Sequence, residues 1–172
     1  MEDVLAVYRR PYDPARPAQE FLRICMDEMS CQLLRHVYAS TEARPGTLCR
    51  HDYHYKRNGT VNLSTFFEPL AVRRVVLTRE RRTKIDWAMC VREVLDMHYP
   101  DVETVALVMD NLNTHGLSSL CEIFAPAEAR RLGRRLEIHY TPEHGSWLNM
   151  AEIEQLVMAR QAPSRRIPDR EA

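Results

Sequence analysis

The stretch Phe21-Leu-Arg-Ile-Cys-Met-Asp27 is an apolar run, interrupted only by Arg23, that ends at an acidic residue. Val105-Ala-Leu-Val-Met-Asp110 repeats this pattern later in the chain. Short apolar runs of this kind are typical of strands buried in a sheet. The sequence therefore predicts two buried strands that each end at a carboxylate.

Further strands are predicted outside these two runs. Thr60–Leu70 and Val72–Thr78 are rich in β-branched and aromatic residues, with Pro69 near the turn between them. Asn58-Gly59 comes just before and is a strong hairpin signal. Leu136–Tyr140 is another strand candidate. Strands that follow one another directly favour antiparallel pairing, whereas strands that alternate with helices favour parallel pairing.

Helical patterns occupy the remaining segments. Thr83 and Asp86 have the spacing of a capping box, Pro126 can open a helix that runs to Gly133, and a last helix begins near Asn149. The side chains expected to face the core are Ile85, Ala88, Val91 and Leu95, then Leu117, Leu120, Cys121 and Phe124, and finally Ile153, Leu156 and Val157. This order predicts an α/β fold: a mixed sheet, antiparallel strands first and parallel strands later, with helices on both faces.

The composition is that of one globular domain. The chain has 172 residues, and its 24 basic residues balance 24 acidic ones, so net charge alone does not indicate a nucleic-acid partner. Residues 1–20 read as a connector helix and a proline-rich linker, residues 21–160 as the main domain, and residues 161–172 as a basic, disordered tail. The five cysteines form no CxxC pair, which favours reduced thiols in the cytoplasm. No apolar run approaches the length of a membrane span.

Acidic residues are the strongest candidates for function. Asp27 and Asp110 follow the two apolar strands, and carboxylates on neighbouring strand ends plus one on a helix can hold two divalent cations. Because side chains alternate along a strand, only one of Asp27 and Glu28 can point at a given site. On the last helix, periodicity leaves Glu152 and Glu154 as equal alternatives. Asn149 and Glu152 are also spaced nearly as a capping box, so Glu152 has a purely structural alternative.

Several motifs together resemble a known family. Val108-Met-Asp110-Asn-Leu-Asn-Thr-His115 is followed by Glu137-Ile-His-Tyr-Thr-Pro-Glu-His-Gly-Ser-Trp-Leu-Asn-Met-Ala-Glu152, and Cys25-Met-Asp27-Glu28 precedes both. The chain resembles the DDE endonuclease domain of bacterial mariner-like insertion-sequence transposases from about Asp3 to Arg160.

The resemblance implies a ribonuclease H-like fold and a DNA transposase reaction. That reaction is metal-dependent phosphodiester cleavage at transposon ends, followed by strand transfer to target DNA by in-line attack. Asp27 and Asp110 match the two aspartates of the family. Its glutamate follows a Leu-Asn-Pro-Ile-type turn, whose place Leu148–Ala151 takes here, so Glu152 matches and Glu154 does not. These three residues are then the catalytic ligands of two Mg²⁺ or Mn²⁺ ions. Active relatives work as dimers on paired DNA ends, which implies a homodimer in the bacterial cytoplasm.

Candidate DNA contacts are of two kinds. Arg81, Arg82 and Lys84 flank a predicted helix start, where phosphate is favoured, although a solvated surface explains them equally well. Trp147 can stack on a base or sugar, or can serve the core or a lid. We also count His115, within the second acidic motif, among the candidate contacts.

Three departures from the family pattern indicate a fragment or a decayed copy. The spacing from Asp110 to Glu152 is somewhat longer than in animal mariner-type relatives, which we assign to Ala125–Arg135. No helix-turn-helix segment precedes the domain, and the segment from Ala162 disrupts the expected last helix. The alternative function is therefore an inert fragment that acts, if at all, as an interaction module. A different ribonuclease H-like nuclease, which cuts RNA strands or junctions, is a third interpretation that Ser146-Trp-Leu-Asn disfavours.

Overall fold

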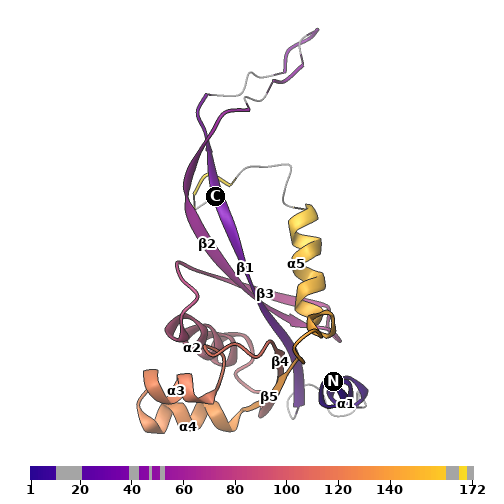
Figure 1. Ribbon diagram of the computed structural model, residues 1–172, viewed down its shortest axis with the longest axis vertical. Coiled ribbons are helices and arrows are strands. Elements are labelled where there is room, and N and C mark those ends of the chain that lie inside the picture. Colours follow the sequence, from indigo (N-terminus) through magenta and orange to yellow (C-terminus); the bar gives the residue numbers. More distant parts are fainter. Residues whose placement is uncertain (11–20, 39–42, 47, 51–52, 162–166, 170–172) are drawn as a thin grey trace.

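The computed structural model describes residues 1–10, 21–38, 43–46, 48–50, 53–161 and 167–169. Its centre is a five-stranded sheet of order β3-β2-β1-β4-β5 (Figure 1). The strands are β1 (Phe21–His36), β2 (Tyr55–Glu68), β3 (Arg73–Arg79), β4 (Thr104–Met109) and β5 (Leu136–Tyr140). The first three pair antiparallel, and β4 and β5 continue the sheet in parallel to β1. The predicted mixed sheet is confirmed.

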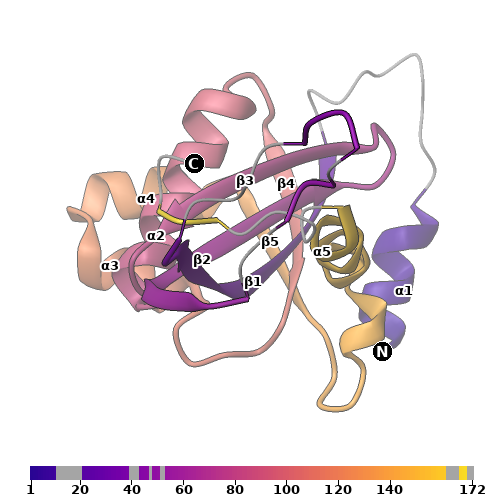
Figure 2. The ribbon, with the colours of Figure 1, turned by 90° about the horizontal axis from the view of Figure 1, so that it is seen from above.

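Helices cover both faces of this sheet (Figure 2). They are α1 (Glu2–Arg9), α2 (Lys84–Glu93), which continues as the π-helix η1 (Val94–His98), α3 (Leu117–Ile123), α4 (Pro126–Arg134), the 3₁₀ turn η2 (Ser146–Leu148) and α5 (Met150–Gln161). α2, α3 and α4 lie on one face, and α1 and α5 lie on the other. The predicted capping box is present, since Thr83 and Asp86 bond reciprocally at the start of α2.

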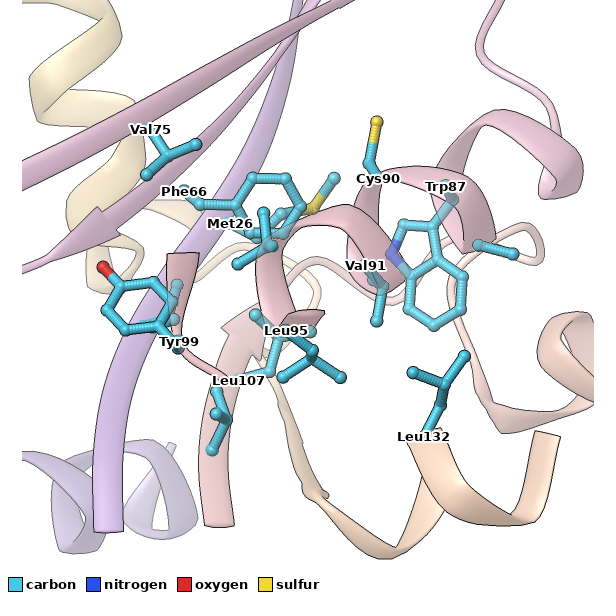
Figure 3. Close-up of a cluster of buried hydrophobic side chains, with 14 of the residues drawn as sticks. Met26, Phe66, Val75, Trp87, Cys90, Val91, Leu95, Tyr99, Leu107 and Leu132 are labelled. Carbon is cyan, nitrogen blue, oxygen red and sulfur yellow. The ribbon is translucent and has the colours of Figure 1, made fainter. Parts of the chain in front are cut away.

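The two faces of the sheet bury two separate cores. The larger core lies under α2–α4 and contains Met26, Trp87 and Leu107 (Figure 3). The smaller core lies under α1 and α5 and contains Cys25 and Val108. Neighbouring residues of β1 and β4 thus point into opposite cores, as alternation requires. This double burial explains why both strands read as continuous apolar runs.

The Asn58-Gly59 dipeptide does not form the predicted hairpin turn. Both residues lie inside β2, which begins at Tyr55. The β1–β2 register shifts between Gln32 and Leu34, whose partners are Thr60 and Arg57, so two residues of β2 oppose one of β1. Gly59 has φ +97° in this bulge, a conformation that glycine adopts without steric cost. The predicted hairpin turn at Asn58-Gly59 is therefore wrong, and the dipeptide forms part of a β-bulge instead.

Three helices present a different face to the core than periodicity predicted. On α3, Leu120 is buried as expected, but Leu117 and Cys121 are exposed. Ile85 on α2 is 60% exposed, whereas Trp87 is fully buried. On α5, Ile153 and Leu156 are 55% and 60% exposed, and the helix buries the small side chain of Ala151 instead. A small residue lets α5 pack closely on the sheet, a reason that hydrophobic periodicity does not register.

The N-terminal helix is part of the domain. Val4 and Val7 are fully buried in the smaller core, whereas residues 1–20 were read as a connector. The Tyr8 hydroxyl donates to the carbonyl of Leu148 at 2.7 Å, which ties α1 to η2. The expected proline-rich linker lies outside the described residues.

At the other end of the chain, most of the basic tail also lies outside the described residues. Within its described part, the carbonyl of Ile167 accepts a hydrogen bond from the amide of Leu34 at 2.8 Å. All five cysteines are free thiols, as the lack of CxxC pairs suggested. No helix in the described ranges is long and apolar enough to span a bilayer.

The capping box at the start of α2 gives a first prediction. Thr83→Ala removes the side chain that accepts from the Asp86 amide, so we expect the free energy of unfolding to fall by about 1–2 kcal/mol. Urea unfolding followed by circular dichroism measures the change. Ser118→Ala, at an exposed position in α3, is the control and should change stability by less than about 0.5 kcal/mol. Equal effects of the two substitutions would contradict the capping assignment.

Candidate active site

Asp27 and Asp110 are neighbours because β1 and β4 run in parallel. The last pair in their register is Cys25 with Val108, and each aspartate lies two residues beyond its member of that pair. Side chains two residues apart on a strand point to the same face of the sheet. Asp27 therefore lies on the same face as Cys25, which packs in the smaller core beneath α5. Asp110 follows the last residue of β4, with its side chain 36% exposed. The prediction that Asp27 ends its strand is wrong, because β1 continues through it to His36 in pairing with β2. The parallel register of β1 and β4 nevertheless brings the two aspartates to the same place.

Asn149 brings the first turn of α5 to the same place. Its side-chain amide donates to the carbonyl of Met26 at 2.8 Å, and its Oδ1 accepts from the amide of Ala151 at 3.2 Å. The start of the helix is therefore anchored to the residue that precedes Asp27. The amide of Asn149 donates to the carbonyl of Ser146, so it is not held by Glu152 in a reciprocal capping box.

The two glutamates of α5 have different surroundings. Glu154 bonds to Arg74 of β3 at 3.0 Å. The charge of Glu152, in contrast, acts on Asp27 and raises its pKa. Of the two glutamates, Glu152 is therefore the one whose charge acts on Asp27.

Burial is the largest cause that raises the pKa of Asp27 to about 6. The charges of Asp110, Glu152 and Glu28 also act to raise this pKa, whereas the hydrogen bond from the Glu28 amide acts to lower it. That amide donates to Asp27 Oδ1 at 2.8 Å. Like charges disfavour ionisation only when they are close. Asp110 and Glu152 are therefore close enough to Asp27 for their charges to act on it.

The donor set of this site suits a hard divalent cation. Carboxylate oxygens are the ligands that Mg²⁺ and Mn²⁺ prefer, and a cation among them would relieve the repulsion that raises the Asp27 pKa. Within the described ranges, no three His, Cys, Asp or Glu side chains are grouped closely enough to hold a metal ion as they stand. The fit therefore rests on the oxygen donors and their mutual repulsion.

His115 is buried rather than presented to DNA. Only 3% of the residue is exposed, so the expectation that it contacts DNA does not hold in this structure. Its Nδ1 lies 2.9 Å from Asp110 Oδ1, and its Nε2 lies 3.6 Å from Glu28 Oε1. Burial lowers the pKa of His115, but the hydrogen bond with Asp110 and the nearby carboxylate of Glu28 outweigh burial and raise it to about 9. The ring is thus a cation between two acids at neutral pH.

The other candidate DNA contacts lie at the surface. Arg81 and Arg82 are exposed between β3 and α2. Lys84 pairs with Glu122 at 2.9 Å, so a phosphate contact would have to replace that pair. Trp147 is 66% exposed in η2, which excludes a core role for it. Sequence reasoning missed the roles of Asn149 and Glu28, although both residues lie within the motifs quoted above.

A protein-family model matches residues 23–172, and its description is DDE superfamily endonuclease. The chain belongs to this family. Two solved structures share the fold of this chain: the Mos1 mariner paired-end complex with Mn and the Mos1 transposase paired-end complex with left transposon end. Each has a TM-score of 0.55 and 15% sequence identity over 99% of this chain. The likeness confirms the ribonuclease H-like fold.

The matched region is only part of those proteins. The alignments cover 49% and 48% of the Mos1 chains, so this chain spans about half their length. No curated protein matches the chain. DDE endonucleases as a family use divalent metals, which agrees with the oxygen donors of the site.

The raised pKa of Asp27 predicts a dependence of stability on pH. Its folded pKa of about 6 exceeds the reference value of 3.8, so its contribution to stability is complete below pH 3.8 and is lost as pH rises through 6. Asp27→Asn removes this loss, and we expect it to stabilise the protein by about 1–2 kcal/mol at pH 7.5 after solvent screening.

Thermal or urea unfolding of both proteins at pH 4 and pH 7.5 measures this difference. At pH 4 the gain should shrink strongly, because Asp27 is then protonated in the folded state and already partly protonated in the unfolded state. Glu154→Gln is the control and should show no such pH-dependent gain, since Arg74 already compensates that carboxylate. A stabilisation by Asp27→Asn of the same size at both pH values would contradict the prediction.

Proposed function

We propose that this chain is a transposase catalytic domain that cleaves DNA phosphodiester bonds at transposon ends and transfers the cut strand to target DNA. Asp27, Asp110 and Glu152 act as the catalytic carboxylates and hold two Mg²⁺ or Mn²⁺ ions. The single observation that carries this proposal is the parallel register of β1 and β4, which brings Asp27 and Asp110 to the same place, where the bond between Asn149 and Met26 also holds the start of α5. Acidic side chains positioned on rigid elements in this way, with a perturbed pKa, are typical of a functional site.

The residues of the site have separable tasks. Asp27 and Asp110 sit on the two central strands, and Glu152 is brought to them by the bond between Asn149 and Met26. Mg²⁺ or Mn²⁺, when bound, activates the attacking water and stabilises the leaving 3′ oxygen. The carboxylates hold their charge in fixed positions around the scissile phosphate, which is the positioning that phosphoryl transfer requires. The freed 3′ hydroxyl then attacks target DNA in line, so no covalent bond to a protein side chain is needed.

The DNA partner follows from the same reaction. The Mos1 structures are paired-end complexes, one of them with a transposon end, and this supports DNA ends as the substrate. We extend this to a homodimer of the present chain on paired ends and on target DNA in the cytoplasm. Arg81 and Arg82 are the proposed phosphate contacts because both are exposed beside the start of α2. Lys84 and the exposed ring of Trp147 are secondary candidates.

Nicking of supercoiled plasmid in Mg²⁺ or Mn²⁺ tests the proposed reaction. We expect the wild-type chain to nick, and Asp110→Asn and Glu152→Gln each to lose at least about a hundredfold in rate, because each removes a metal-binding oxygen. Glu154→Gln is the matched control on the same helix and should retain wild-type activity, since Glu154 bonds to Arg74. A folded wild type that does not nick would favour the inert fragment. Full nicking by Asp110→Asn would refute the site assignment.

The phosphate contacts are tested by the salt dependence of DNA affinity. Arg81→Ala with Arg82→Ala should weaken duplex binding and reduce the slope of log K against log salt by about 1–2, because each lost phosphate contact releases fewer counterions. Fluorescence anisotropy over a range of salt concentrations measures the slope. Arg130→Ala, exposed on α4, is the control for general charge. A slope that changes equally in both variants would show that the two arginines are ordinary surface charge.

A further inference from the structure

A buried histidine lies directly behind Asp110. The side chain of His115 is 1% exposed, and its Nδ1 is 2.9 Å from Asp110 Oδ1. An ionised carboxylate only accepts hydrogen bonds, so Nδ1 carries the proton and donates it. One oxygen of Asp110 is therefore engaged behind the site, and Oδ2 is the atom left for a ligand.

Hydrogen bonds to backbone carbonyls hold the loop from Asp110 to His115 in place. The amide of His115 donates to the carbonyl of Leu112 at 2.9 Å, and the Tyr140 hydroxyl donates to the carbonyl of His115 at 3.0 Å. The Ser119 hydroxyl donates to the carbonyl of Thr114 at 2.9 Å. These bonds fix the backbone that carries the imidazole, so the ring is a rigid support rather than a mobile side chain.

The ring is also held from its other sides. Glu28 follows Asp27 on β1 and, by alternation, points to the opposite face of the sheet, where its Oε1 lies 3.6 Å from His115 Nε2. The Glu28 side chain is 6% exposed. The Trp87 ring stacks on the imidazole, with centroids 6.0 Å apart and an interplanar angle of 25°. Glu28, His115 and Asp110 therefore form a chain that links β1 to the end of β4 beneath the acidic site.

We propose that His115 is a positioning residue that fixes the orientation of Asp110, and that Glu28 holds the ring in place. This inference rests on the proposed function, because it concerns how Asp110 offers Oδ2 to a divalent cation. Partners of this kind orient metal-binding side chains, and their loss typically weakens metal affinity about 10- to 100-fold. Glu28 thereby has a role distinct from that of its neighbour: Asp27 faces the cation, and Glu28 supports the second aspartate.

Two substitutions of His115 separate the hydrogen bond to Asp110 from the rest of the ring. His115→Asn keeps an N–H donor where Nδ1 lies, whereas His115→Ala does not, and both remove the imidazole ring. We therefore expect His115→Ala to bind Mn²⁺ about tenfold more weakly than His115→Asn. Electron paramagnetic resonance of free Mn²⁺, titrated with the DNA-free protein, measures the affinity without reference to cleavage. Circular dichroism verifies that each variant is folded.

His139 provides the matched control. Its side chain is 7% exposed and its Nδ1 lies 2.8 Å from Asp3 Oδ2, so it forms a comparable His–Asp pair on β5. His139→Ala and His139→Asn should show equal Mn²⁺ affinities. In an Asp110→Asn background, the difference between His115→Ala and His115→Asn should vanish, because the carboxylate through which His115 acts is gone.

The outcomes distinguish this inference from the proposed function. Equal Mn²⁺ affinities of His115→Ala and His115→Asn, in a protein whose wild type binds Mn²⁺ and nicks DNA, would overturn the positioning role alone. A difference that persists in the Asp110→Asn background would overturn it as well. A folded wild type that does not bind Mn²⁺ would overturn both proposals.

Discussion

The parallel pairing of β1 with β4 is the constraint on which the site depends. This pair lies at the centre of the sheet and is buried on both faces, so its register is specified by two cores at once. A slip of one residue would exchange the side chains of the larger core for those of the smaller one. The same register sets Asp27 beside Asp110. The acids thus inherit their spacing from hydrophobic packing, without a direct bond between them.

Hydrogen bonds to backbone atoms then add the remaining parts. Asn149 joins the start of α5 to β1, and Tyr140 joins β5 to the loop that carries His115. Both bonds end on backbone carbonyls, that of Met26 in β1 and that of His115 in the loop. The carboxylates are therefore carried by segments whose backbone positions are fixed by hydrogen bonds. Such rigid support is a requirement for holding cations in a defined geometry.

Much of the fold was predictable because its central strands are buried on both faces and leave an unbroken apolar signal. Strand termini and helix faces were harder. β1 continues ten residues past Met26 to His36. This segment mixes polar and apolar residues and contains no continuous apolar run that would predict a strand. Asn58-Gly59 forms a bulge in β2 because the partner strand extends past it. The face of α5 depends on close packing of Ala151, a residue too small to mark a stripe.

The candidate site shows the same division. The aspartates follow recognisable strands, and Glu152 was distinguished from Glu154 only by resemblance to the family. The environment of His115 could not be predicted, because Glu28 and Trp87 come from distant segments and meet it only in the folded chain. A histidine five residues after an aspartate is compatible with a surface loop, and its burial is a tertiary property.

The hydrogen bond between Tyr8 and the Leu148 carbonyl changes where the domain can be divided. Composition places a boundary at residue 21, yet α1 supplies two fully buried valines to the core beneath α5. A polypeptide beginning at Phe21 would expose Cys25 and Val108 to water and leave the Leu148 carbonyl without this donor. The turn η2, which precedes Glu152, would then lose its packing against α1. The first ten residues therefore support the turn that leads to Glu152, although they are distant from it in the sequence.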